Sequence, residues 1–336
     1  MIVDLRSDTV TKPTPGMLRA MMNAEVGDDV FGEDPAINEL ESKLAGMFGM
    51  EAGLFCPSGT MSNQIAIKCF TNPLDELIAD QTAHVYRYEG GGIAFNSGVS
   101  TRLLNGERGI ITAEMIAPEI NSENVHFPHT SLVVLENTVN KGGGSCYTLE
   151  QIAPIAKLCK EHNLKLHLDG ARIFNALAYT GDKAIDYGQY FDGISVCLSK
   201  GLGAPVGSVF LADTTTIKYA RRVRKVFGGG MRQAGFLAAA CIYALDNHVE
   251  RLKIDHANAA LLASELAKLP WVSGVVPAET NIVLFDTVEP ADIVAKKLEE
   301  KGIRAIPTAR NRIRFVLHLD VTPEQIAYAV KSLKEI

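Results

Sequence analysis

The sequence predicts an α/β protein, in which a large domain with a largely parallel sheet between helices precedes a small C-terminal α+β domain. Two observations predict this architecture. Helical patterns alternate with short apolar runs up to about residue 225, and the pattern changes character after Pro270. The chain of 336 residues, 47% of them hydrophobic, is also long enough to bury a large core.

Periodicity and capping place the first helices and strands. Residues 35–49 carry apolar positions at helical spacing and end at a glycine, and residues 148–162 begin with Thr148 and Gln151 as a capping box. Short apolar runs between the helices are typical of strands buried on both faces of a sheet. These runs are residues 131–135, 164–168, 193–198 and 207–211.

The pattern from residue 231 to about residue 268 is long and helical, which predicts a helix that crosses a domain boundary near residue 250. Two apolar runs, NIVLFDT and RIRFVLH, then frame a helix at 289–301. A last helix starts at Thr322, with a proline in its first turn and Gln325 as the return partner of the cap. We therefore expect a large domain at 1–250 and a small domain at 251–336.

Charge and hydropathy exclude several classes of partner. The formal net charge is -6, and no run of five or more like charges occurs, so neither nucleic acid nor an acidic membrane surface is an expected partner. The longest apolar stretch, residues 235–245, is too short to span a bilayer, and the opening MIVDLRSDTV lacks the pattern of a signal peptide. A cytoplasmic protein with a small-molecule ligand is expected.

The six cysteines show no CxxC spacing and no clustering with histidine. This scatter is typical of reduced core residues in a cytosolic protein, so no metal site is expected. The cysteines are Cys56, Cys69, Cys146, Cys159, Cys197 and Cys241.

Lys200 lies in the stretch CLSKGLGAP, at the end of an apolar strand. One interpretation is a solvated lysine at a surface turn. The alternative is an amine at the carboxyl edge of the sheet, where open α/β folds bind ligands and where desolvation makes it a nucleophile suited to a Schiff base. The glycines of GLGAPVG do not form a dinucleotide fingerprint, because a strand and not a helix follows them.

Asp169 follows directly on another apolar strand, in LHLDGARIF. It could cap the next helix. It could also be an anion that holds a cation at the strand end, and for a pyridine ring it would keep the ring nitrogen protonated.

Ser58, Gly59 and Thr60 precede an apolar-periodic helix in LFCPSGTMSNQIAI. Helix capping alone would explain these residue types. Glycine also permits close backbone approach, so free N–H groups at the helix start could bind a phosphate. The absence of GK[ST] excludes a nucleotide P-loop.

His84, Tyr88 and Glu89 lie in AHVYRYEGGG, ahead of three glycines. A lone histidine is more often structural than functional, so spacing alone does not assign His84 a role. A lysine, a strand-end aspartate, a helix-start phosphate site and a ring nevertheless match together what pyridoxal phosphate requires.

The sequence resembles the low-specificity L-threonine aldolases, which belong to the aspartate-aminotransferase-like group of pyridoxal-phosphate enzymes. The resemblance runs through nearly the whole chain, and several motifs in order are more specific than any one. These motifs are LRSDTVTKPTPGM, GDDVFGEDP, PSGTMSN, AHVYRYEGGG, HFPHTSLVVLENT, HLDGARIFNA, SKGLGAPVGS, GGGMRQ and IRFVLHLDVTPEQ. It implies fold type I, with a mostly parallel seven-stranded sheet in the large domain.

For the cofactor, the resemblance implies that Lys200 binds pyridoxal 5'-phosphate covalently and that Asp169 pairs with the pyridine nitrogen. Ser58, Gly59 and Thr60 would bind the phosphate, and His84 would stack on the ring. Arg172 would lie in contact with cofactor and substrate.

For the substrate, the resemblance implies that Ser7, Arg172 and Arg314 bind the carboxylate, with Tyr88 also in contact, so segment 1–14 would contribute to the active site. Arginine suits a planar carboxylate because it binds with two parallel hydrogen bonds. From the residues alone, Arg314 could equally be an exposed strand charge.

The resemblance further implies a homotetramer, a dimer of dimers in which neighbouring chains share active sites. Arg232 would then reach a phosphate across the interface. One motif departs from the family, because Phe31 stands where many relatives have tyrosine. Selectivity or affinity would differ if that hydroxyl contacts the substrate or the phosphate.

The implied reaction is cleavage of L-threonine or L-allo-threonine to glycine and acetaldehyde. A base removes the β-hydroxyl proton, and His84, His126 or a water between them are the candidates. His126 and the nearby His129 could simply be loop residues.

Three other functions compete with this one. A β-eliminating lyase or a transaminase would use the same fold. A nicotinamide oxidoreductase would need the missing fingerprint, and a non-catalytic relative should have lost Lys200 or Asp169, which are both present.

Overall fold

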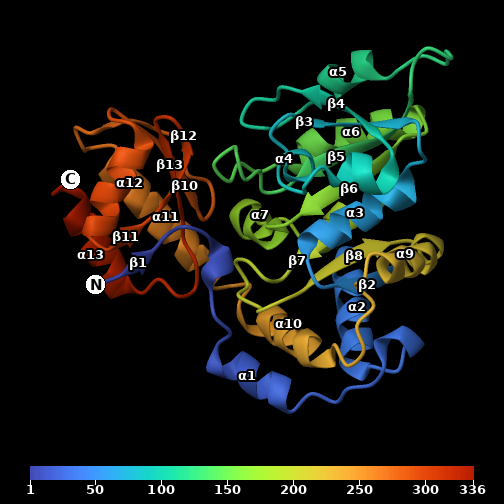
Figure 1. Ribbon diagram of the computed structural model, residues 1–336, viewed down its shortest axis with the longest axis horizontal. Helices are drawn as coiled ribbons and strands as arrows, with labels where there is room; N and C mark the ends of the chain where they lie inside the picture. The colour runs from blue at the N-terminus through green and yellow to red at the C-terminus, as the bar shows by residue number, and fades with distance from the viewer.

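The computed structural model describes residues 1–336. Its centre is a seven-stranded sheet with the order β2-β8-β7-β6-β5-β3-β4, and β8 alone runs antiparallel to its neighbours. Figure 1 shows this sheet between layers of helices. The strands are β2 (Ala52–Cys56), β3 (Asp75–Asp80), β4 (Ser100–Leu104), β5 (His129–Glu136), β6 (Lys165–Gly170), β7 (Gly193–Cys197) and β8 (Ser208–Ala212).

Both faces of the sheet are buried, because successive side chains of each strand point to opposite sides. In β5, Leu132 and Val134 pack in one apolar cluster with α3 (Gly59–Phe70) and α9 (Thr214–Val226). Val133 and Leu135 pack in the other cluster, under the remaining helices. Those helices are α1 (Pro15–Met22), α2 (Pro35–Phe48), α5 (Ala113–Ile116), α6 (Leu149–Glu161), α7 (Ile173–Thr180), α8 (Ala184–Gly188) and α10 (Gly235–Asn247). The short helix α4 (His84–Arg87) follows β3.

A smaller unit with its own core follows. Its antiparallel sheet has the order β12-β13-β10-β9. The strands are β9 (Val272–Val275), β10 (Ile282–Thr287), β12 (Ile306–Ala309) and β13 (Arg312–Val316), and the helices are α11 (Leu252–Leu266), α12 (Ala291–Glu300) and α13 (Pro323–Leu333). No helix in the protein is long and apolar enough to cross a membrane.

The amino terminus belongs to this smaller unit. Strand β1 (Val3–Asp4) pairs in parallel with β11 (Ile303–Arg304). Val3 and Leu5 are part of the hydrophobic core of the smaller unit. Figure 1 shows both chain ends on the same unit. The division near residue 250 stays a prediction, and the packing adds the first five residues to the smaller unit.

Most predicted elements lie within a few residues of their expected bounds, and both predicted capping boxes, at Thr148 and Thr322, are present. The prediction of one helix crossing residue 250 is wrong. Helix α10 ends at Asn247 and α11 begins at Leu252. At the break, the His248 imidazole Nδ1 bonds to the carbonyl of Leu202 (2.7 Å), so a long-range contact fixes the turn.

Candidate active site

The candidate site lies where strands of the large sheet end at their carboxyl edge, as expected for an α/β fold. Ser58 follows β2, Glu136 ends β5, Asp169 is the last residue but one of β6, and Lys200 follows β7. Since β5, β6 and β7 are parallel neighbours, residues far apart in sequence meet at one edge.

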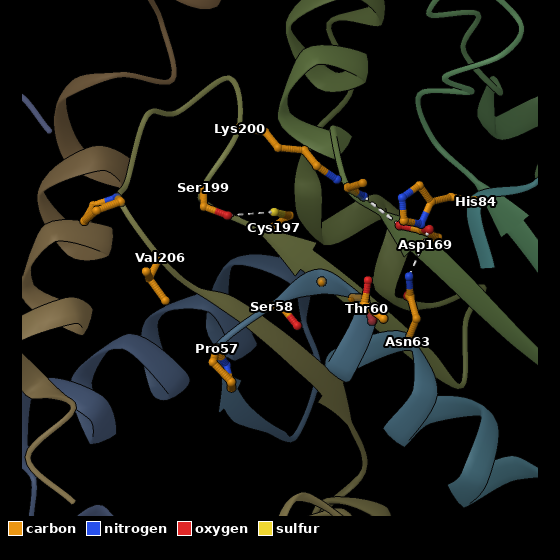
Figure 2. A pocket seen from close by; sticks show the side chains of 14 residues that line it. Pro57, Ser58, Thr60, Asn63, His84, Asp169, Cys197, Ser199, Lys200 and Val206 are labelled. Carbon is orange, nitrogen blue, oxygen red and sulfur yellow. Dashed lines mark hydrogen bonds between the residues drawn. The ribbon is translucent and has the colours of Figure 1, made fainter. Parts of the chain in front are cut away.

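A first cavity of about 210 Å³ collects the predicted cofactor residues. Figure 2 shows the Lys200 side chain extending toward Asp169 and His84, with Ser58 and Thr60 on the facing wall. The predicted residues among its lining are Ser58, Gly59, Thr60, His84, Asp169 and Lys200.

A second cavity of about 460 Å³ shares His84 and Lys200 with the first. It collects the predicted substrate residues Ser7, Tyr88, Arg172 and Arg314, and none of its lining residues is acidic. The arrangement therefore provides a cationic chamber next to the first cavity.

Two predicted residues are not brought to either cavity of this single chain. His126 is exposed in the loop before β5, where its backbone N–H donates to Asn124 (3.0 Å). Arg232 is also exposed and pairs with Asp28 (2.9 Å). Their roles at the site stay predictions. Phe31, in the same segment as Asp28, is 74% exposed.

The start of α3 combines a capping residue with polar groups that have no hydrogen-bond partner. Ser58 is the N-cap, and its Oγ accepts from the N–H of Met61 (3.1 Å). The first N–H groups of a helix have no partner within the helix, so those of Gly59 and Thr60 are available to an anion. The buried Oγ of Ser208 has no hydrogen-bond partner, and a Cβ at Gly59 would lie 3.6 Å from it. A phosphate group fits this set of donors.

Asp169 does not cap a helix. Its Oδ1 accepts from the N–H of Ala171 (3.1 Å), whereas α7 starts later with Arg172 at its N-cap position. Its Oδ2 accepts from Asn63 Nδ2 (3.0 Å), which also donates to Glu89 (3.0 Å). The amide of Asn63 thus fixes two buried carboxylates at once, and Asp169 still borders the first cavity.

His84 is oriented by the buried carboxylate of Glu89. The distance from His84 Nδ1 to Glu89 Oε1 is 3.0 Å. Since an ionised carboxylate only accepts hydrogen bonds, Nδ1 carries the proton and Nε2 is left free in the neutral ring. Burial works to lower the pKa of His84, but the hydrogen bond to Glu89 and the charge of Asp169 outweigh it and the pKa is raised.

His84, Glu89 and Asp169 also offer atoms that could bind a metal ion, all within 4.8 Å of one another. Each of the four carboxylate oxygens, however, already accepts a hydrogen bond from the protein. The donors are Asn63, Gln64, His84 and the backbone of Ala171. Hydrogen bonding therefore accounts for this cluster.

Arg172 forms a buried ion pair with Asp8, through Nε to Oδ2 (2.7 Å) and Nη2 to Oδ1 (2.6 Å). Burial works against the ionised form of Asp8, but the charge of Arg172 outweighs it and the pKa of Asp8 is lowered. The resemblance implied a contact of Arg172 with substrate. Two of its nitrogens are committed to Asp8, and Nη1 makes no hydrogen bond within the chain.

Arg314 has the features of an anion-binding group. Its Nη1 donates to Asn140 Oδ1 (2.7 Å) and its Nη2 to the carbonyl of Arg6 (3.1 Å), but it forms no ion pair with a carboxylate, and none of the residues around its cavity is acidic. Its Nε is buried without a partner. Burial and the nearby Arg172 lower the pKa of Arg314 to about 10, so the guanidinium remains charged at neutral pH.

Sequence reasoning missed several residues that build the site. Glu136 could have been found, because a charged residue ending an apolar strand is the same signal that identified Asp169. Glu89 lies close to His84 in AHVYRYEGGG, but spacing alone assigned it no role. Asn63, Asn140 and Ser208 carry no local signal, because the parts of the site that they meet are distant in sequence.

Comparison with known proteins agrees with this geometry. The beta-eliminating lyase family matches residues 4–290. The low-specificity L-threonine aldolase 1 of Arabidopsis thaliana is 41% identical, over 99% of this chain and 96% of the plant protein. The chain belongs to this aldolase family. The low specificity L-threonine aldolase of Escherichia coli K12 is 42% identical, over 97% of this chain and 96% of the bacterial protein.

The fold of the family is also that of a solved relative. The threonine aldolase of Leishmania major superposes with a TM-score of 0.85 at 22% identity, covering 99% of this chain and 98% of that protein. The predicted fold class, a mostly parallel seven-stranded sheet with a small α+β unit, is thus confirmed.

Proposed function

We propose that this protein is a pyridoxal-phosphate-dependent aldolase, which cleaves L-threonine and L-allo-threonine to glycine and acetaldehyde. The observation that carries this proposal is the junction of the two cavities at Lys200. The Lys200 amine borders both cavities, so it would face a phosphate at the start of α3 on one side and an amino acid in the cationic chamber on the other.

The residues of the first cavity fit the cofactor. Lys200 would bind it covalently, and Asp169 would hold its pyridine nitrogen. The phosphate would occupy the start of α3, where Gly59 and Thr60 offer N–H groups and Ser208 offers an unpaired hydroxyl. His84 borders both cavities and would cover the ring at the place where the substrate arrives.

The residues of the second cavity fit the carboxylate of an amino acid. Arg314 has an unpartnered Nε and no competing acid, and Ser7 and Arg172 lie beside it. A guanidinium that is fixed by Asn140 and the Arg6 carbonyl is already oriented before the carboxylate binds. Binding there would hold the amino acid in one orientation against the ring, so that its Cα–Cβ bond can break.

The cofactor, when bound, supplies an electron-accepting ring for the pair released from the broken Cα–Cβ bond. The chain's own contribution is the removal of the β-hydroxyl proton. His84 can accept it at Nε2, because Glu89 holds the ring proton at Nδ1. Glu89 then stabilises the imidazolium that forms. His126 remains a second candidate base, one that an assembled oligomer would have to bring to the site.

A homotetramer with shared sites remains part of the proposal, as does a cytoplasmic location. Support for an interface comes from the segment around Phe31. The N–H of Asp29 donates to the carbonyl of Arg232 (3.1 Å), so this segment is packed against the predicted interface residue while Phe31 projects outward. An interface here would bury Phe31 and place Arg232 toward a neighbouring chain.

A second function, β-elimination of a small amino acid, is supported by the description of the matching family as beta-eliminating lyase. Transamination is the other reaction that the same fold would allow. Product analysis separates these reactions after incubation of the cofactor-loaded protein with L-threonine. Glycine and acetaldehyde in equal amounts support the aldolase. Formation of ammonia with an oxo acid, or transfer of the amino group to an oxo acid, would instead support β-elimination or transamination, respectively, and contradict the aldolase proposal.

A further inference from the structure

Glu136 is a buried carboxylate that contacts two residues of the second cavity, His84 and Asn140. It is the last residue of β5, only 6% exposed, and has no basic side chain within ion-pair distance. Its Oε2 accepts from the backbone N–H of His84 (3.0 Å), and its Oε1 accepts from the backbone N–H of Asn140 (3.0 Å). One side chain thus joins α4 to the loop after β5.

Each of these two contacts leads to a residue of the proposed reaction. The N–H of His84 belongs to the residue whose imidazole borders both cavities. Asn140 carries the Oδ1 that accepts from Arg314 Nη1 (2.7 Å). The contacts therefore run from the backbone of His84 through the Glu136 carboxylate to Asn140, and from the Asn140 side chain to the guanidinium of Arg314.

Only the ionised carboxylate satisfies both N–H groups. A protonated Glu136 would present a hydroxyl donor, and neither N–H can accept from it. The groups around it act in opposite directions. Burial and then the charge of Asp169, its neighbour in register on β6, raise the pKa of Glu136 to about 7, against the two backbone hydrogen bonds and the charge of His84. The positive charge of Arg172, at the start of α7, also interacts with the carboxylate of Glu136.

We propose that Glu136 is a positioning residue, which in its carboxylate form holds His84 and Arg314 at a fixed separation for the bound amino acid. This inference rests on the proposed use of the second cavity for the substrate. It predicts that the affinity for the amino acid weakens as Glu136 takes up a proton. The backbone N–H of either His84 or Asn140 then loses its acceptor, so that residue is no longer held in place.

The test is the dissociation constant of L-threonine and of glycine for cofactor-loaded Glu136→Gln, measured by the change in the cofactor's absorption between pH 6 and 8. We expect binding about tenfold to a hundredfold weaker than wild type at pH 8, because glutamine cannot accept at both positions. The ratio between variant and wild type should narrow toward pH 6, where wild-type Glu136 is protonated as well. A merely structural defect would give a ratio that does not change with pH.

Glu76→Gln is a matched control. Glu76 is also a buried strand carboxylate, but it bonds to Asn121 and Arg102 away from both cavities. The amino-acid dissociation constant of Glu76→Gln should equal that of the wild type at every pH. A Glu136→Gln protein with wild-type affinity, or with a ratio independent of pH, would overturn the inference.

Asn140→Ser keeps the test decisive if Glu136→Gln fails to fold. It removes the contact to Arg314 and leaves Glu136 in place, so weaker binding is expected with the wild-type pH dependence retained. Unchanged binding would contradict the inference. Because these measurements record binding and not turnover, they remain informative even if no acetaldehyde is released and the aldolase proposal fails.

Discussion

Arg172 and Asp8 are joined by two buried hydrogen bonds, and both side chains are at most 5% exposed. Asp8 lies in the N-terminal segment, and Arg172 follows β6 of the large sheet. Asn281, in the smaller unit just before β10, also donates to Asp8 (3.3 Å). This one carboxylate therefore joins three separate parts of the chain beside Arg172, a lining residue of the second cavity.

Asp8→Asn should destabilise the protein by about 3 kcal/mol or more, because the buried charge of Arg172 loses its partner. Urea unfolding of the cofactor-free protein measures this. Since Arg172 lowers the pKa of Asp8, the pair contributes fully above the unfolded-state pKa of about 3.9 and is lost as the pH falls through the lower folded-state value. The difference from wild type should shrink only in that acid range. Glu250→Gln, which breaks an exposed pair with Lys253, should have no measurable effect.

Arg314→Lys should raise the KM for L-threonine by about tenfold to a hundredfold, with a smaller effect on kcat. A lysine cannot keep the contacts to Asn140 and Arg6 and also bind a carboxylate with two hydrogen bonds. Steady-state kinetics measures both constants. Arg312→Lys is the control, since Arg312 makes a two-point pair with Asp286 on the same small sheet and borders neither cavity. Equal effects of the two substitutions would argue against a carboxylate site at Arg314.

Glu89→Gln should shift the activity of the enzyme along the pH scale. Removing the carboxylate removes the hydrogen bond and the charge with which Glu89 raises the pKa of His84, so this pKa should fall even though Asp169 still acts to raise it. The pH at which kcat/KM rises should therefore move to lower values, and the maximum rate should fall because the resulting imidazolium is less stabilised. An NMR titration of the His84 ring checks the pKa directly. A pH profile unchanged from wild type would exclude His84 as the base.

Gly59→Ala should weaken binding of pyridoxal phosphate without unfolding the protein. The nearest atom to an added Cβ is the Ser208 hydroxyl at 3.6 Å, an ordinary contact, so the cofactor-free protein should keep its melting temperature. The methyl group would instead enter the space in which a phosphate approaches the helix start. Fluorescence titration with the cofactor measures the affinity.

Gly46→Ala provides the comparison for this substitution. Gly46 lies in α2, and an added Cβ there meets nothing within 4 Å. It should stabilise the helix by about 0.5–1 kcal/mol and leave cofactor affinity unchanged. Identical cofactor affinities for the two alanine variants and wild type would show that the phosphate does not bind beside Gly59.

The sheet and the residues at its edge could be predicted because both have local signals. A run such as SLVVL marks a strand with two buried faces, and the polar residue that follows it lands at the carboxyl edge. That logic identified Asp169 and Lys200, and applied once more it would have identified Glu136. The two capping boxes were equally local, since each needs only four neighbouring residues.

The network that fixes these residues could not be predicted in the same way. Arg172 and Asp8 are 164 positions apart, and Arg314 and Asn140 are 174 positions apart. Nothing near Asn63 in the sequence indicates that its amide joins Asp169 to Glu89. The end of α10 was missed for a similar reason, because His248 bonds to a carbonyl 46 residues away. Pairings of this kind depend on the folded chain.

The most direct test of the central claim is the visible absorption spectrum of the purified protein and of Lys200→Ala. Each is recorded before and after addition of L-threonine or L-allo-threonine, with acetaldehyde release coupled to a dehydrogenase. We predict a band from lysine-bound pyridoxal phosphate in the wild type, acetaldehyde from either substrate, and loss of both in the variant. A wild-type protein without this band even after reconstitution with the cofactor would contradict the account.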